Sequence, residues 1–108
     1  MLGSSPVMAF VPSTDLARSR VFYEDLLGLT VSELTPYALV LRGAGTTIRV
    51  ARVEELTPQP FTVLGWVVTD LAAAMGPLTA GSVEFTVYEG VGQDCNGVWT
   101  TPNGDRIA

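Results

Sequence analysis

The sequence repeats itself, and this internal repeat constrains the fold more than any other feature. The residues Thr-Asp-Leu-Ala occur at 14–17 and again at 69–72, each time after a short apolar run and before a pattern of helical spacing. A shorter match relates 29–31 to 85–87 with a shift of one residue. Internal repeats indicate that one supersecondary unit occurs more than once. We therefore predict a single domain over 1–108, made of two copies at about 5–55 and about 61–108.

The first copy predicts the order β-α-β-β-β. Residues 6–11 are apolar and β-prone, as expected of a half-buried strand. Thr14 or Asp15 can cap a helix that starts at Leu16, and Gly28 fits the left-handed position after its end. Three further strands are predicted at 29–34, 37–41 and 46–53, with a turn at 43–45.

The second copy follows a linker at 54–60 and predicts a strand at 61–68, a helix at 71–79 and a strand at 83–88. Because proline lacks a backbone donor, Gly76-Pro77 predicts that this helix is short or broken. Strands at 98–101 and from Arg106 onward end the sequence, so the last strand of the first copy has no counterpart. We expect that the natural chain continues with this strand; alternatively, another chain supplies it.

Composition excludes several classes of function. The chain has eleven acidic residues, six arginines, no lysine and no histidine, with a net charge of −5. Nucleic-acid binding requires clustered positive charge, which is absent, so no nucleic-acid partner is expected. The single Cys95 has neither a disulfide partner nor a histidine base, and we interpret it as an incidental loop thiol. Without a signal peptide or an apolar run of about 20 residues, we expect a soluble, cytoplasmic protein with no membrane partner.

Residues 10–29 resemble the vicinal oxygen chelate superfamily, which includes glyoxalase I, extradiol dioxygenases, and the fosfomycin and bleomycin resistance proteins. Asp15-Leu16, Phe22-Tyr23 and Leu27-Gly28-Leu29 carry the resemblance at these spacings. The resemblance implies an α+β fold in which two βαβββ modules form a curved-sheet cleft, commonly within a homodimer. It does not define the chemistry, because one fold can host unrelated activities.

The resemblance also implies where a metal ion would be bound. Enzymes of this superfamily have a histidine in the first strand of each module and a glutamate in the last. These positions fall on Met8, Val63 and Arg49, and the fourth lies beyond Ala108. A thioether suits soft metals, valine has no donor atom, and guanidinium repels cations. We therefore expect no metal and no other cofactor.

Strand alternation predicts which side chains line the cleft. With Met8 at the ligand position, Phe10 shares its face, whereas Ala9 and Val11 face the helix. Trp99 is a candidate for the rim of the cleft, with structural packing as the alternative role, and Trp66 is expected in the core. The predicted ligand-binding residues are Met8, Phe10, Arg49, Val63, Val67 and Trp99.

Two function classes fit this pattern. The first is a metal-free binding protein that holds a small, partly apolar molecule with an anionic group at Arg49. The second is a metal-independent lyase, isomerase or hydrolase that uses Arg49 for electrostatic stabilisation and a carboxylate as base. Binding is favoured because no carboxylate is clearly directed into the cleft. A different interpretation makes Arg49 a surface residue paired with Glu33 or Glu55, and the sequence does not identify the ligand.

Overall fold

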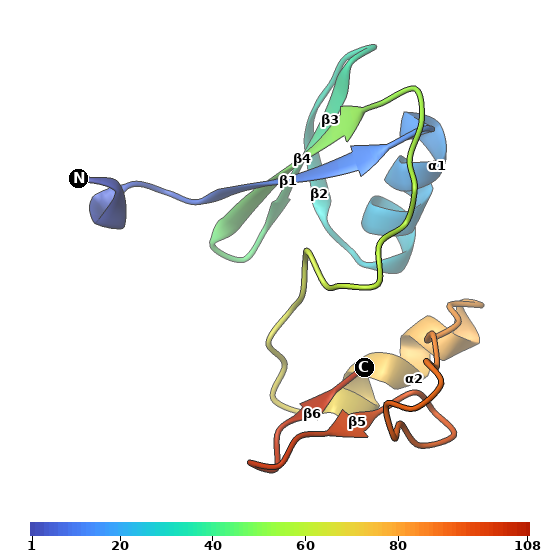
Figure 1. Ribbon diagram of the computed structural model, residues 1–108. Helices are drawn as coiled ribbons and strands as arrows, with labels where there is room; N and C mark the ends of the chain where they lie inside the picture. Colours follow the sequence, from blue (N-terminus) through green and yellow to red (C-terminus); the bar gives the residue numbers. More distant parts are fainter. The chain divides into compact units, whose positions relative to one another are not determined.

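The first predicted module folds in the expected order. In the computed structural model, which describes residues 1–108, the chain divides into two units, Met1–Gly65 and Trp66–Ala108. The first unit begins with a 3-10 turn, η1, and contains four strands and one helical region (Figure 1). In order, the elements are η1 (Leu2–Ser4), β1 (Met8–Ser13), α1 (Leu16–Arg20), η2 (Val21–Leu26), β2 (Thr30–Leu34), β3 (Ala38–Gly43) and β4 (Thr46–Arg52).

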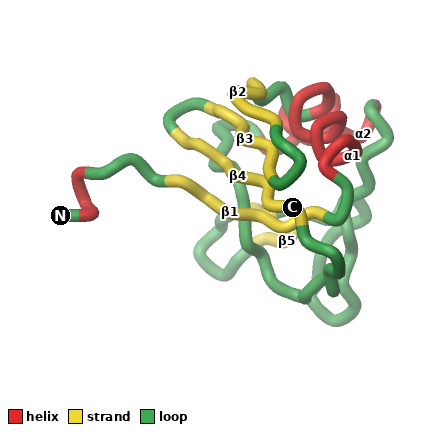
Figure 2. The backbone as a smooth tube through the Cα atoms, turned by 90° about the horizontal axis from the view of Figure 1, so that it is seen from above, coloured by secondary structure: helices red, strands yellow, loops and turns green.

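The four strands form one curved, mixed sheet in the order β1-β4-β3-β2 (Figure 2). Strand β1 is parallel to β4, and the other neighbours are antiparallel. Arg49 on β4 is the register partner of Phe10 on one side and of Val40 on the other. The pairing of β2 with β3 shifts between Val31 and Glu33, as in a β-bulge.

The helical region between β1 and β2 starts and ends as the sequence predicts. The Asp15 carboxylate accepts a hydrogen bond from the Arg18 N–H at 3.1 Å, which satisfies an unpaired donor of the first turn. After α1, the segment η2 is π-helical, and the Leu27 N–H donates to the Phe22 carbonyl, five residues earlier, at 3.0 Å. Gly28 then has φ +74°, a left-handed conformation that glycine adopts without steric cost.

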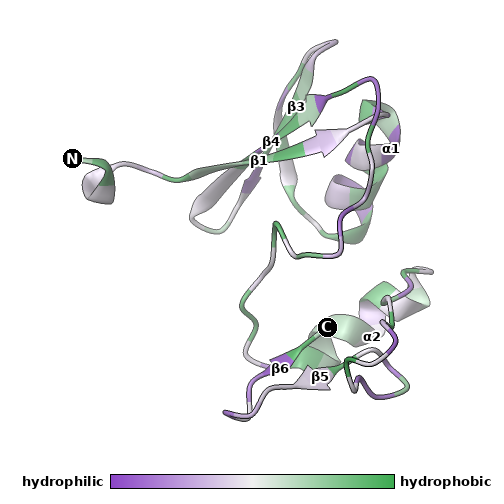
Figure 3. Cartoon of the chain, viewed as in Figure 1, coloured by the Kyte–Doolittle hydropathy of each residue, from purple (hydrophilic) through white to green (hydrophobic).

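One face of the sheet carries the hydrophobic core of the first unit. Its fully or nearly fully buried residues are Val11, Leu39, Leu41, Ile48 and Val50. Side chains from the helical region, including Leu16 and Tyr23, pack against this cluster, and burial raises the pKa of the Tyr23 hydroxyl. Figure 3 shows the hydrophobic stretches along the strands. Ala9 and Val11 therefore face the helix, as alternation predicts.

The second unit contains α2 (Leu71–Ala80), β5 (Trp99–Thr100) and β6 (Arg106–Ile107), the last two forming an antiparallel pair. The Asp70 carboxylate caps α2 by accepting the Ala73 N–H at 3.0 Å. The sequence predicts a short or broken helix here; α2 has 10 residues and runs unbroken through Pro77. Proline removes only its own donor, and the Gly81 N–H still bonds to the Pro77 carbonyl at 3.0 Å.

Two predicted strands of the second copy, 61–68 and 83–88, are not strands in the structure. In the first unit, β1 pairs only with β4. Residues 61–68 pair with no other strand in the structure, and a strand is defined by its ladder of hydrogen bonds. Trp66, expected in the core, is about half exposed.

The loop before β5 is organised by the side chains of Gln93 and Asp94. Gln93 accepts the Tyr88 N–H at 2.6 Å and donates to the carbonyl oxygens of Thr86 at 2.9 Å and Gly97 at 2.7 Å. The Asp94 carboxylate accepts the N–H groups of Asn96 and Val98. Backbone hydrogen bonds, first that from Val98, hold the pKa of Asp94 below its usual value.

Candidate functional site

The face of the four-stranded sheet opposite the helix places several predicted site residues side by side. We call it the helix-free face. Met8 and Phe10 project from it because their neighbours Ala9 and Val11 pack toward the helix, and 45% of Met8 and 66% of Phe10 are exposed. The same alternation defines its other members. The helix-free face comprises Met8, Phe10, Pro12, Thr30, Glu33, Ala38, Val40, Arg42, Thr47, Arg49 and Ala51.

Arg49 lies at the centre of this face and is partly buried. Its register partners are the apolar residues Phe10 and Val40. The one salt bridge of the structure joins Arg20 to Glu24 at 3.1 Å, so Arg49 is not ion-paired with Glu33 or with Glu55. A partly buried guanidinium between apolar neighbours favours a counter-charge from outside the chain, because a desolvated cation is stabilised by an anion.

The remaining predicted residues lie elsewhere in the two units. Val63 is exposed and lies outside the strands of the first unit. Val67 and Trp99 belong to the second unit, Val67 fully exposed and Trp99 on β5 with 37% of its surface exposed. Their participation in a common site with Met8, Phe10 and Arg49 stays a prediction.

The side chains at the expected metal positions do not fit a hard metal ion. Met8 offers only a thioether, Val63 offers no donor, and Arg49 carries a positive charge. No group of three histidine, cysteine, aspartate or glutamate side chains is arranged to hold a metal anywhere in the structure. The chemistry available on the helix-free face is therefore hydrogen bonding, charge and apolar contact.

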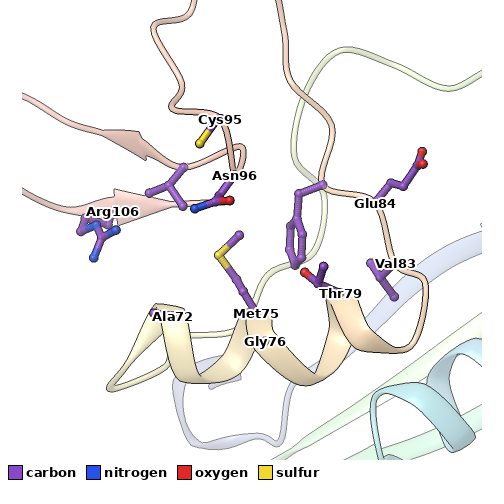
Figure 4. Close-up of a pocket in the computed structure, with 11 residues that line it drawn as sticks. Ala72, Met75, Gly76, Thr79, Val83, Glu84, Cys95, Asn96 and Arg106 are labelled. Carbon is purple, nitrogen blue, oxygen red and sulfur yellow. The ribbon is translucent and has the colours of Figure 1, made fainter.

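A separate pocket of about 620 Å³ lies within the second unit (Figure 4). Met75 projects into it from α2, Cys95 and Asn96 face it from the loop, and Arg106 lies at one end. Sequence analysis did not identify this pocket, because it lies beside α2 where the expected strand 83–88 is not formed.

A smaller pocket of about 390 Å³ lies in the first unit, beside the start of α1. Asp15, Leu16 and Arg52 are among its lining residues. Neither this pocket nor the one in the second unit includes any of the six predicted ligand-binding residues. On the helix-free face, Met8 and Phe10 are exposed and Arg49 is partly buried.

Comparison with solved structures identifies the fold. The chain is similar to a bleomycin resistance determinant encoded on the transposon Tn5, with a TM-score of 0.66, 16% identity, and coverage of 95% of this chain and 84% of that one. It is also similar to an integron cassette protein from the mobile metagenome of V. cholerae, with a TM-score of 0.54 and 20% identity over 96% and 91% of the two chains. A protein from the mobile metagenome of V. pseudocholerae gives a TM-score of 0.56 and 19% identity over 96% and 91%.

These similarities confirm the predicted α+β fold. The similar structures include a bleomycin resistance protein, as the resemblance of residues 10–29 implies for the glyoxalase and bleomycin resistance superfamily. No family model and no curated protein sequence matches the chain. No helix of the structure combines the length and the apolar character needed to cross a membrane. At these identities the comparisons establish the fold, and a function has to be argued from the residues of this chain.

Proposed function

We propose that the protein binds a small, partly apolar, anionic molecule on the helix-free face, without a metal ion. Arg49 holds the anionic group by charge-assisted hydrogen bonds, and Met8 and Phe10 contact the apolar part. That Val63, Val67 and Trp99 also contact the ligand stays a prediction. The observation that carries it is a partly buried Arg49 that has apolar register partners and no ion pair.

Arginine in this position has a different capability from a metal ion. Its guanidinium binds carboxylate or phenolate oxygen through directional hydrogen bonds. It does not lower the pKa of a bound water as zinc does, so it supports binding better than hydrolysis. Similarity to a bleomycin resistance determinant is compatible with a binding role, although the ligand of that protein is not assigned to this chain.

The metal-independent enzyme is the second candidate, and one residue favours it. Glu33 is the register partner of Val40 and lies on the helix-free face, as a general base would have to. It is two strands away from Arg49, which corresponds to about 9–10 Å between backbone positions. A substrate would have to span that gap, so binding remains the better-supported function.

Replacing Arg49 by methionine tests the proposed function. We expect the dissociation constant of an aromatic acid to rise about tenfold to a hundredfold, because a charge-assisted hydrogen bond contributes about 1.5–3 kcal/mol. The ligand is first found by thermal-shift screening of small aromatic acids and their neutral amides. Affinities for the acid and its amide are then measured by titration calorimetry.

The neutral amide is the control for this experiment. Its shape is close to that of the acid, but it lacks the negative charge, so Arg49→Met should change its affinity much less. Equal losses for acid and amide would show that Arg49 acts only in the structure of the sheet, and the site would then have to be withdrawn.

We further propose that the binding form is a homodimer. Each unit is smaller than about 70–80 residues, a size at which a single core is only weakly stabilised. Exposed apolar side chains such as Phe61, Trp66 and Val67 remain to be covered. Multi-angle light scattering at micromolar concentration should give twice the chain mass of 11.5 kDa. A single-chain mass over the whole concentration range would contradict the dimer.

A further inference from the structure

The helix-free face carries a second arginine next to Arg49. Arg42 on β3 is the register partner of Thr47 on β4, and Thr47 precedes Arg49 by two residues. Arg42 and Arg49 are therefore diagonal neighbours on one face of an antiparallel pair. Such positions are about 7–8 Å apart, within the reach of two long side chains that converge on one group.

Neither guanidinium has a carboxylate partner within the chain. Arg42 is exposed, Arg49 is partly buried, and the structure's one salt bridge involves neither of them. The chain as a whole has a net charge of −5 and only six arginines, so two unpaired arginines on one face form a local region of opposite sign. Two adjacent like charges repel each other, and an anion between them removes that repulsion.

The acidic residue of this face lies on the side away from the apolar contacts. Glu33 is on β2, the edge strand farthest from β1, and is paired with Val40. Between β1 and β3 the face holds Met8 and Phe10, then Thr47 and Arg49, then Arg42. From β1 to β3, the face therefore changes from exposed apolar side chains to the Thr47 hydroxyl and the two guanidinium groups. No carboxylate lies between them.

From this arrangement we infer that the ligand is a dianion, a small molecule whose head group carries two negative charges and whose apolar part lies against Met8 and Phe10. The inference rests on the proposed function. Arg49 binds one charged oxygen and Arg42 binds the second, while the Thr47 hydroxyl is placed to donate to the same group. A phosphate monoester or a pair of neighbouring carboxylates has this chemistry.

Phenyl phosphate and its monomethyl ester, methyl phenyl phosphate, are the probes. At pH 8 the first carries two negative charges, because the second pKa of a phosphate monoester is about 6, and the ester carries one. We expect wild-type protein to bind phenyl phosphate about tenfold more tightly than the ester. Arg42→Gln should abolish this preference by weakening the dianion about tenfold and the ester less than about twofold. Arg49→Met should weaken both probes.

Glu33→Gln serves as the matched charge variant on the same face. Removing this carboxylate should leave the preference for the dianion intact or increase it, since Glu33 is diagonal to Arg42. Thermal midpoints of all variants establish that each is folded. If Arg42→Gln weakens both probes equally or neither, or if wild-type protein does not prefer the dianion, the dianion inference is overturned and the proposed function stands. If Arg49→Met changes the affinity for neither probe, the proposed function itself fails.

Discussion

Replacing Leu39 by alanine is expected to lower the free energy of unfolding of the first unit by about 2–5 kcal/mol. Leu39 has 0% exposure, lies on a strand between two others, and belongs to the core cluster with Val11, Leu41, Ile48 and Val50. The cost combines the lost burial of the removed carbons with the cavity that remains, which the strands on both sides prevent from closing. Urea unfolding followed by far-ultraviolet circular dichroism measures the change in the midpoint of the unfolding transition.

Leu34→Ala is the matched control for this variant. Leu34 is the register partner of Leu39 on the neighbouring strand, yet the residue is 49% exposed. Its truncation removes little buried surface, so we expect a loss of less than about 1 kcal/mol. Similar losses for the two variants would mean that the core is not centred on β3.

The elements of the first unit could be predicted from the sequence because local signals and tertiary packing agree there. Asp15 caps the helix and Gly28 adopts positive φ, as both residues prefer to do. Alternation along β1 places Val11 in the core and Phe10 on the opposite face. Each signal depends on neighbours in sequence or on a partner strand that the chain supplies.

In the second unit, local sequence signals predict the helix but not the pairing of strands. Residues 61–68 have strong β-propensity, but a strand requires a partner that completes its hydrogen bonds, and in the structure these residues pair with no other strand. Propensity alone therefore predicted a strand that the structure does not form. The helix α2 needed only its Asp70 cap and its own hydrogen bonds, and it forms at the predicted place without a break at Pro77.

Only part of the helix-free face could be predicted from the sequence, because alternation is a local signal and strand length is not. Met8, Phe10 and Arg49 follow from alternation once one position is fixed. Arg42 was missed because the strand was predicted to end at residue 41, whereas β3 extends to Gly43 and pairs Arg42 with Thr47. The end of a strand is set by its pairing with the neighbouring strand, which the local sequence of one strand does not encode.

Replacing Gln93 by alanine is expected to destabilise the closed loop of the second unit by about 1.5–3 kcal/mol. The Gln93 amide makes three hydrogen bonds, one to the Tyr88 N–H and two to the carbonyl oxygens of Thr86 and Gly97. In the alanine variant these backbone groups hydrogen-bond to water instead, because residues 86–97 form no strand that could pair with them. Protection of the Tyr88 amide against hydrogen exchange should therefore fall about tenfold to a hundredfold.

Gln59→Ala is the control for this loss, because Gln59 makes a single, exposed hydrogen bond to the Thr57 carbonyl at 3.3 Å. We expect its effect on stability to lie within about 0.5 kcal/mol, as for most exposed side chains. The Asp94 hydrogen bonds to Asn96 and Val98 remain in both variants, so the Val98 amide reports on the rest of the loop. If Gln93→Ala leaves the Tyr88 amide protected, the loop is closed by the packing of the buried Val98 and not by the Gln93 side chain.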